Sequence, residues 1–321
     1  MIEEVFSVEL PVGERLVIKK NSIIGKGQGS DVGAEAHQPP KRFAVVTGIH
    51  GDEFEGQYIC YEIARRLKEH PEALNGTVDI YPALNPLGLD VADRKLPTLE
   101  MDMNRIFPGV EKGTAMERTA AAIVNDIAGA DLCLDVHASD IFVKEIPQVR
   151  ISEEFADRLL PFARMLNTDM IWTNASATVH ESTLAHSLNM LGVPTLVVEL
   201  GMGNRINRRF GNQVVEGIFH LLQEIDMWSG PVGKIQYPVV STDGEVVFIR
   251  SECTGVFLPA IEHNHYVKKG DRLGEIVSPL EGKVLDEIIA RKSGLVFSLR
   301  EYPFVREGSL LARILIGIEE E

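Results

Sequence analysis

The chain has 321 residues, of which 45% are hydrophobic and 25% charged, and its formal net charge is −15. This composition is typical of a globular protein, and the length is sufficient for two domains. A sequence pI near 5.1 argues against nonspecific binding to nucleic acid or to anionic membranes, because both require a basic face.

The N-terminal stretch "MIEEVFSVEL" has neither the basic start nor the apolar run of a signal peptide. No apolar run approaches the roughly 20 residues needed to cross a bilayer. The cysteines, Cys60, Cys133 and Cys253, are too widely spaced for a zinc ribbon or a disulfide framework. Buried thiols in a reducing compartment explain them best. We therefore expect a cytoplasmic protein with no membrane segment.

From about residue 41, short apolar runs alternate with stretches of helical periodicity. This alternation predicts an α/β sheet covered by helices on both faces. The predicted strands are 42–48, 76–86, 131–138 and 194–201, and the predicted helices are 53–70, 115–129, 152–166, 182–192 and 212–225.

Beyond Gly230 the helical periodicity stops and short β-rich runs are separated by Gly and Pro. Residues 254–276 and 293–314 share the form G-(strand)-V-x-x-G-x-x-L-x-x-I, which predicts two strands joined by a glycine turn in each copy. This repeat resembles half of the barrel-sandwich hybrid fold of biotinyl and lipoyl carrier domains. It therefore predicts a β-rich, barrel-sandwich-like segment at the C-terminus.

The change of pattern predicts a boundary near Trp228, between an α/β domain of residues 1–229 and a β-rich domain of residues 230–321. A carrier domain would present a lysine in a tight turn between the two halves of the repeat. Lys283 lies there without the flanking methionines of such a motif. A structural role, or a lid over the α/β domain, is the better interpretation.

The segment "TGIHGDEFEG" places His50 and Glu53 after the predicted strand 42–48, where a helix begins. Functional residues of α/β sheets gather at the carboxyl ends of strands. The spacing H-x-x-E lets both side chains reach one ion. An acidic residue at a helix N-terminus also interacts favourably with the helix dipole, so capping is the alternative role for Glu53.

A second predicted strand ends in His137, and a third carries Glu199 within the apolar run "LVVELG". A lone histidine at a strand end is usually structural, but two histidines and a glutamate form the His₂Glu set of catalytic zinc sites. A carboxylate is costly to bury unless it is paired or used. A general base for metal-assisted hydrolysis would explain Glu199.

The loop 83–109 lies in the sequence between the two predicted strands that lead to His50 and His137, and it contains Arg94, Asn104 and Arg105. Arginine pairs bidentately with carboxylates and can stabilise a developing oxyanion. A surface salt bridge is the alternative for either arginine taken alone.

The motifs occur in a fixed order: H-G-D-E, N-P-x-G, an arginine, D-x-N-R-x-F-P-G, a strand ending in D-x-H, and a strand bearing glutamate. Over roughly residues 40–225 this order resembles the succinylglutamate desuccinylase/aspartoacylase family, relatives of the zinc carboxypeptidases. The resemblance implies a zinc-carboxypeptidase-like mixed sheet flanked by helices, followed by a β-rich C-terminal domain. It also implies one zinc ion (Zn²⁺) per chain.

The resemblance further implies that His50, Glu53 and His137 are the zinc ligands. Asp102 would then be the carboxylate that orients a ligand histidine, with His50 the expected partner.

By the same resemblance, Glu199 is the general acid/base and Arg94 polarises the scissile carbonyl. Asn104 and Arg105 would bind the carboxylate of the substrate. The segment 182–194, which precedes Glu199, contains no arginine. Relatives that hydrolyse acidic N-acyl amino acids present a further arginine in this segment, so the resemblance does not extend to a strongly acidic substrate side chain.

These residues predict a zinc-dependent hydrolase that deacylates an N-acyl amino acid or a similar small amide, of the desuccinylase or deacetylase type. A metallocarboxypeptidase acting on peptide C-termini and a zinc-holding binding protein without catalysis are the alternatives. Tyr266 and Tyr302 are candidates for a family tyrosine of the C-terminal domain, without motif support. The acyl group, the amino acid and the oligomeric state stay open, a homo-oligomer included.

Overall fold

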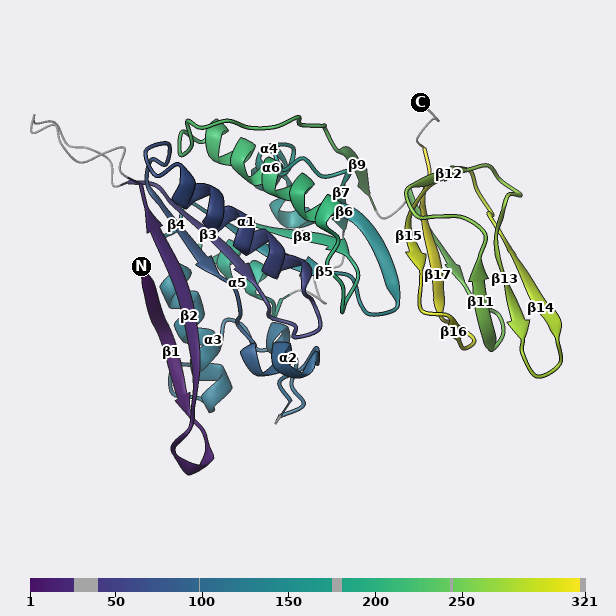
Figure 1. Cartoon of the computed structure of the whole chain (residues 1–321), viewed down its shortest axis with the longest axis horizontal. Helices are drawn as coiled ribbons and strands as arrows, with labels where there is room; N and C mark the ends of the chain where they lie inside the picture. Colours follow the sequence, from purple (N-terminus) through teal and green to yellow (C-terminus); the bar gives the residue numbers. More distant parts are fainter. Residues whose placement is uncertain (26–39, 98, 175–180, 243–244, 318–321) are drawn as a thin grey trace, which may run out of the picture.

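The computed structural model describes residues 1–25, 40–97, 99–174, 181–242 and 245–317. Within these residues, a mixed sheet of thirteen strands runs through the molecule and a second sheet has four antiparallel strands. Figure 1 shows the N-terminal hairpin at one end of the molecule and the C-terminal strands at the other. The predicted fold class, a mixed α/β sheet with helices followed by a β-rich segment, is confirmed.

The centre of the large sheet consists of four parallel strands in the order β4-β3-β5-β8. Parallel strands buried on both faces are nearly continuous apolar runs, and every residue of β5 is buried. The strands are β3 (Arg42–Thr47), β4 (Thr77–Tyr81), β5 (Leu132–Ala138) and β8 (Thr195–Gly201).

Helices cover both faces of this sheet (Figure 1). Successive side chains of a strand point to opposite faces. Phe43 and Val45 therefore pack on one set of helices, and Ala44 and Val46 on the other. The first set is α1 (Glu55–Glu69), α4 (Ala156–Ala163) and α6 (Arg208–Glu224); the second is α3 (Ala115–Ile127) and α5 (Leu184–Met190).

Two predicted helix starts are wrong for local reasons. The helix predicted at 212–225 already begins at Arg208, because the side chain of Asn207 accepts hydrogen bonds from the N–H groups of Arg209 and Phe210. The helix predicted at 152–166 begins only at Ala156. The residues before it form the end of a strand and a 3-10 turn (Glu153–Phe155).

Several elements have no counterpart in the sequence prediction. An antiparallel hairpin extends the sheet beyond β4, and two strands lie beyond β8. Strand β4 ends at Tyr81, before the predicted residue 86, and a short helix follows it. These elements are β1 (Ile2–Glu9), β2 (Arg15–Ile24), β6 (Val143–Ser152), β7 (Met170–Asn174) and α2 (Pro86–Val91).

The C-terminal strands contribute to both sheets and enclose a core of their own, which includes Phe257, Ile276 and Leu311. Those in the large sheet are β9 (Val239–Thr242), β10 (Val246–Arg250), β12 (His265–Val267), β15 (Gly294–Arg300) and β17 (Leu310–Leu315). Those in the small sheet are β11 (Gly255–Pro259), β13 (Arg272–Ser278), β14 (Lys283–Ile289) and β16 (Phe304–Val305).

The large sheet does not stop at the predicted boundary near Trp228. β9 pairs with β7 in parallel, and β15 pairs with β6 in antiparallel orientation. Backbone hydrogen bonds therefore join the C-terminal segment to the α/β part. The division into domains at residues 229 and 230 stays a prediction. Of the helices that the structure describes, none is both long and apolar enough for a membrane span.

Candidate active site

His50, Glu53 and His137 meet where β3 and β5 end side by side. Thr47, the last residue of β3, pairs with Val136 of β5, so the residues that follow β3 lie next to His137. The carboxylate of Glu53 bridges the two rings: Oε1 is 2.7 Å from Nδ1 of His50, and Oε2 is 2.9 Å from Nδ1 of His137. The two Nδ1 atoms are 3.2 Å apart. All three side chains are buried.

The other nitrogen of each ring contacts a carboxylate. Nε2 of His50 lies 3.2 Å from Oδ1 of Asp102, and Nε2 of His137 lies 3.1 Å from Oδ1 of Asp135. A carboxylate behind a histidine fixes the tautomer that presents the opposite nitrogen to a metal. Asp135 was not among the predicted site residues. The D-x-H spacing was its signal, because residues two apart on a strand share a face.

The donor set fits a zinc ion. Two imidazole nitrogens and a carboxylate converge with their candidate ligand atoms within 4.8 Å of one another, and His₂Glu is a common catalytic zinc set. Burial lowers the pKa of His137, but the Asp135 and Glu53 carboxylates outweigh it and raise that pKa well above its ordinary value. The surrounding carboxylates thus favour positive charge at the centre of the group, as a metal cation would supply.

Arg94 and Asp102 lie against this group. Nη1 of Arg94 is 3.2 Å from Oε1 of Glu53, and Nη2 is 3.5 Å from Oδ2 of Asp102. Asp102 also accepts a hydrogen bond from the backbone N–H of Asn104 at 2.9 Å. The side chain of Arg94 is 40% exposed and lines the cavity described below.

Asn104 and Arg105 follow Asp102 in a 3-10 turn (Met103–Arg105). The side-chain oxygen of Asn104 accepts a hydrogen bond from the N–H of Leu184, at the start of α5, over 2.9 Å. Because the oxygen faces Leu184, the NH₂ group of the same amide points away from Leu184. Nη1 of Arg105 donates to the backbone oxygen of Asn104 over 2.8 Å.

Glu199 lies on β8 directly opposite His137 of β5 in the strand register. Its Oε1 is 3.3 Å from Nη1 of Arg150, which belongs to the unpredicted strand β6. Burial raises the pKa of Glu199, and the charge of Arg150 opposes that rise. Arg150 gave no signal in the sequence, because only the pairing of β6 with β8 brings it to the site.

One cavity of about 200 Å³ connects these groups. Of the predicted site residues, it is lined by His50, Arg94, Asn104, Arg105, His137 and Glu199. Glu53 and Asp102 contact these residues. The structure thus brings all of the predicted site residues together.

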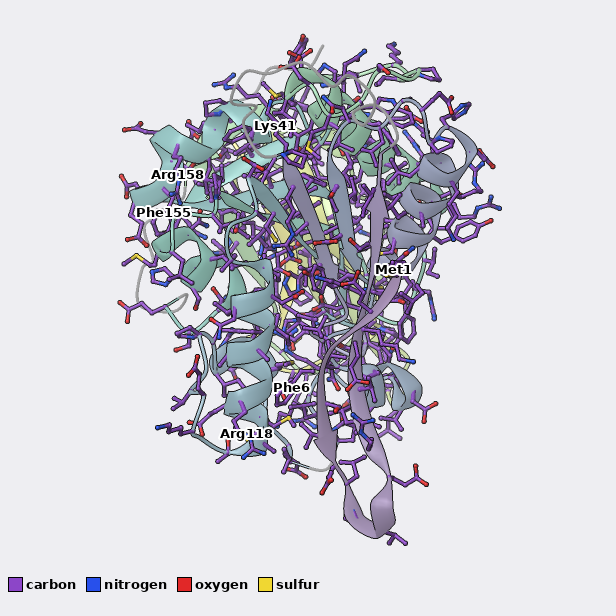
Figure 2. All side chains as sticks on the ribbon, turned by 90° about the vertical axis from the view of Figure 1, so that its left-hand side faces the viewer. Met1, Phe6, Lys41, Arg118, Phe155 and Arg158 are labelled. Atoms are coloured by element: carbon purple, nitrogen blue, oxygen red, sulfur yellow. The ribbon has the colours of Figure 1, made fainter. Side chains whose placement is uncertain are left out.

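The lining of the cavity also includes the apolar side chains of Ile151, Phe155, Leu159 and Val197. Figure 2 labels Phe155 and Arg158, side by side at the start of α4, with the guanidinium 5.5 Å from the centre of the phenyl ring. Arg158 thereby stacks on a side chain that lines the cavity.

The described residues that line the cavity all lie between His50 and Glu199. Tyr302 instead packs edge-on against Phe142, with ring centres 5.3 Å apart, and Tyr266 of β12 pairs with Leu295 of β15. Neither tyrosine candidate is therefore brought to the cavity. Of the thiols, Cys60 and Cys133 are buried, as predicted, whereas Cys253 is partly exposed.

Comparison with known proteins places this site in a family. The model of the family described as the succinylglutamate desuccinylase/aspartoacylase catalytic domain matches residues 39–225, more than half of the chain. An N-alpha-acetyl-L-2,4-diaminobutyric acid deacetylase from Halomonas elongata is 31% identical over 106 residues. That match spans 32% of this chain and 30% of the deacetylase.

Solved structures share the fold over nearly the whole chain. A succinylglutamate desuccinylase/aspartoacylase from Rhodobacter sphaeroides is 22% identical with a TM-score of 0.78, covering 98% of this chain and 94% of its own. The product-bound ectoine utilization protein EutE from Ruegeria pomeroyi is also 22% identical with a TM-score of 0.78, covering 96% and 92%. At this identity the likeness concerns the fold.

Proposed function

Because the chain belongs to the succinylglutamate desuccinylase/aspartoacylase family, we propose that it is a zinc-dependent hydrolase that removes the acyl group from an N-acyl amino acid or a similar small amide. One observation carries the proposal. The His50–Glu53–His137 group, the carboxylate of Glu199 and the flanking arginines meet at a single small cavity.

His50, Glu53 and His137 would hold the zinc ion, with Asp102 and Asp135 orienting the two rings. When bound, zinc supplies Lewis-acid polarisation of the amide carbonyl and makes water more acidic. The remaining chemistry belongs to side chains of this chain.

Arg105 and the amide NH₂ of Asn104 would bind the carboxylate of the substrate, since a guanidinium offers paired donors to a carboxylate. Arg94 would lie beside the acyl carbonyl and stabilise the negative charge that develops on its oxygen. A cavity of about 200 Å³ suits a small amide better than a peptide.

Glu199 would accept a proton from the attacking water and deliver it to the leaving amine. A largely buried carboxyl group with a raised pKa holds a proton more readily than an exposed one, as a shuttle between base and acid requires. The products would be a free amino acid and a carboxylate.

The test is a screen of N-acetyl, N-succinyl and N-formyl amino acids with the zinc-loaded protein, with release of free amine as the readout. We expect hydrolysis that a chelator abolishes and added zinc restores. N-acetyl substrates come first, because the Halomonas elongata relative is a deacetylase by name. Release of C-terminal residues from peptides, without turnover in the screen, would instead support a carboxypeptidase.

A further inference from the structure

A chain of alternating charges connects the C-terminal segment to Glu199. Its members, which we call the Glu145 network, are Arg313 of β17, Glu145 and Arg150 of β6, and Glu199 of β8. Nη1 of Arg313 contacts Oε1 of Glu145. Oε2 of Glu145 accepts a hydrogen bond from Nη2 of Arg150 over 2.7 Å, and Nη1 of Arg150 lies 3.3 Å from Glu199.

The centre of the network is buried, whereas its two arginines are partly exposed. Glu145 is 0% exposed and also accepts a hydrogen bond from Gln148 over 2.8 Å. Removing one partner of a buried carboxylate strongly destabilises the folded protein. Arg150, Arg313 and the amide of Gln148 together pair the carboxylate of Glu145. Arg313 comes from the C-terminal segment, which completes the set only through the pairing of β15 with β6 and of β15 with β17.

Aromatic packing fixes the two guanidinium groups. Arg150 lies 5.5 Å and Arg313 lies 5.9 Å from the ring centre of Trp172. Phe297 of β15 meets the same ring edge-on at 5.8 Å. Guanidinium groups stack favourably on aromatic rings, and stacking restricts their rotation. The contacts of Arg150 with Glu145 and with Trp172 therefore set the direction in which Arg150 presents Nη1 to Glu199.

We propose that Arg150 is a positioning residue for Glu199, and that Arg313 of the C-terminal segment holds Arg150 in place through Glu145. The inference rests on the proposed function, in which Glu199 moves the proton.

The geometry gives Arg150 a defined task. Its Nη1 holds Oε1 of Glu199 and leaves the second carboxylate oxygen for the proton, while Nη2 is engaged by Glu145. An arginine free of Glu145 could turn both nitrogens to Glu199 as a bidentate pair, which would occupy both carboxylate oxygens and leave neither for the proton. Glu145 and Arg313 thus control how strongly Arg150 engages Glu199.

The first test compares Arg313→Met with Arg300→Met in the full-length, zinc-loaded enzyme. Arg300 is a matched control, a buried arginine of the same segment whose hydrogen bonds go to the backbone oxygens of Tyr302, Phe304 and Leu310. Misplacement of a catalytic group by about 1 Å can cost about 100-fold in rate. We expect Arg313→Met to lower kcat about 10- to 100-fold with KM within twofold and zinc content unchanged. Arg300→Met should keep kcat.

The second test uses Arg150→Met and Arg150→Lys. Lysine keeps the charge but not the planar fork, so it should restore only part of the kcat that Arg150→Met loses. In the double variant Arg150→Lys/Arg313→Met, the fold-reduction in kcat should be smaller than the product of the fold-reductions of the two single variants, because both residues act through one network. A merely structural role would instead lower the stability or the zinc content of the variants and leave the kcat of the folded, zinc-loaded enzyme unchanged.

The outcomes separate the two proposals. A parent enzyme that hydrolyses no amide in the screen overturns the proposed function. An active parent whose Arg313→Met variant keeps its kcat overturns the inference alone. If Arg313→Met does not fold, the Arg150 variants decide: a rise in KM at constant kcat would make Arg150 a substrate-binding residue and also overturn the inference.

Discussion

Glu53 and Glu199 are both glutamates of the same cavity region, yet their surroundings drive their pKa values apart. Burial raises the pKa of Glu53, but the two histidines beside it outweigh burial and hold that pKa well below its usual range. Around Glu199 burial dominates and raises the pKa. Opposed shifts of neighbouring carboxyl groups commonly separate a permanently ionised role from a proton-transferring one. The difference supports Glu53 as ligand and Glu199 as acid/base.

The substitution Glu199→Gln keeps the volume of the side chain but removes its ability to take a proton. General acid–base assistance is worth about 10²–10⁴-fold in rate, so we expect kcat to fall by about 10²–10⁴-fold or more, with zinc content and KM little changed. Glu154→Gln, which changes an exposed carboxylate paired with His186, is the control. Turnover within a few-fold of the parent would remove Glu199 from the mechanism, and loss of zinc would make it a ligand.

The variant His137→Ala should lose most of its zinc while the fold persists. His137 contributes one of the three converging ligand atoms, whereas the sheet around it is held by backbone pairing and apolar burial. Elemental analysis and circular dichroism measure the two effects. His186→Ala, which alters the cavity wall without touching the metal group, should keep its zinc. Full zinc occupancy in His137→Ala would contradict the assignment.

At the scale of elements, and within the α/β part, the sequence predicted the strands that are apolar runs and missed those that carry several polar side chains. β3, β5 and β8 are short apolar runs, which periodicity recognises. β6 carries Glu145, Gln148 and Arg150, includes Pro147, and has an irregular register with β8. Its polar side chains are satisfied only by partners distant in sequence, such as Arg313. No local pattern could therefore reveal the strand.

The same distinction explains what the sequence could predict of the site. His50, Glu53 and His137 stand next to recognisable strand ends, and Asp102, Asn104 and Arg105 belong to one short motif. The rule that strand ends meet at one edge brings the first three together, whereas the roles of the other three came from the resemblance of their motif to the family. Arg150 reaches the cavity through antiparallel pairing of a strand that was not recognised. Asp135 lay inside a recognised strand, but its contact with His137 depends on the ring orientation.

Helices α1 and α6 are joined by the ion pair of Arg66 and Glu216. Burial raises the pKa of Glu216, but hydrogen bonds from Arg66 and from the N–H of Gly233 outweigh it and lower that pKa below 4.5. A lowered pKa in the folded state adds stability above pH 4.5, and this stability is lost as the pH falls through the folded-state value.

We therefore expect Glu216→Gln to lower the free energy of unfolding by about 1 kcal/mol at pH 7, with the difference shrinking below about pH 4.5. Urea unfolding at a series of pH values measures it. Glu69→Gln is the control, because the ion pair of Glu69 that the described residues show is with Arg65 of the same helix, α1. A difference that did not depend on pH would contradict the ionic origin.

At the scale of the whole molecule, the C-terminal segment approaches the loop that follows β5. Glu301 and Tyr302 donate backbone hydrogen bonds to the oxygen of Phe142, and Lys144 pairs with Glu301 at 3.3 Å. We keep as a proposal that this segment narrows the approach to the site. The full-length enzyme should then have a much lower kcat/KM for N-acyl dipeptides than for N-acyl amino acids. Equal kcat/KM values would contradict a restriction of substrate size.

The C-terminal segment and the α/β part also share an apolar cluster. Ile146, Met170 and Trp172 pack with Phe297 and with Val246 and Leu315. Because β6 and β15 pair next to this cluster, unfolding of the segment would expose apolar surface on both sides. The two parts should therefore unfold together, even though the segment has a separate core of its own.

Phe297→Ala tests this coupling directly. Phe297 is 0% exposed, and replacing a buried phenylalanine by alanine typically costs about 3–5 kcal/mol. We expect calorimetry of Phe297→Ala to show one transition shifted to lower temperature, with the far-UV and near-UV signals lost together. Phe257→Ala, in the core that belongs to the C-terminal strands alone, is the matched comparison. If either variant gives two transitions of which only one moves, the segment is an independent domain, and the Glu145 network would then have to be held by its ion pairs alone, without a shared core.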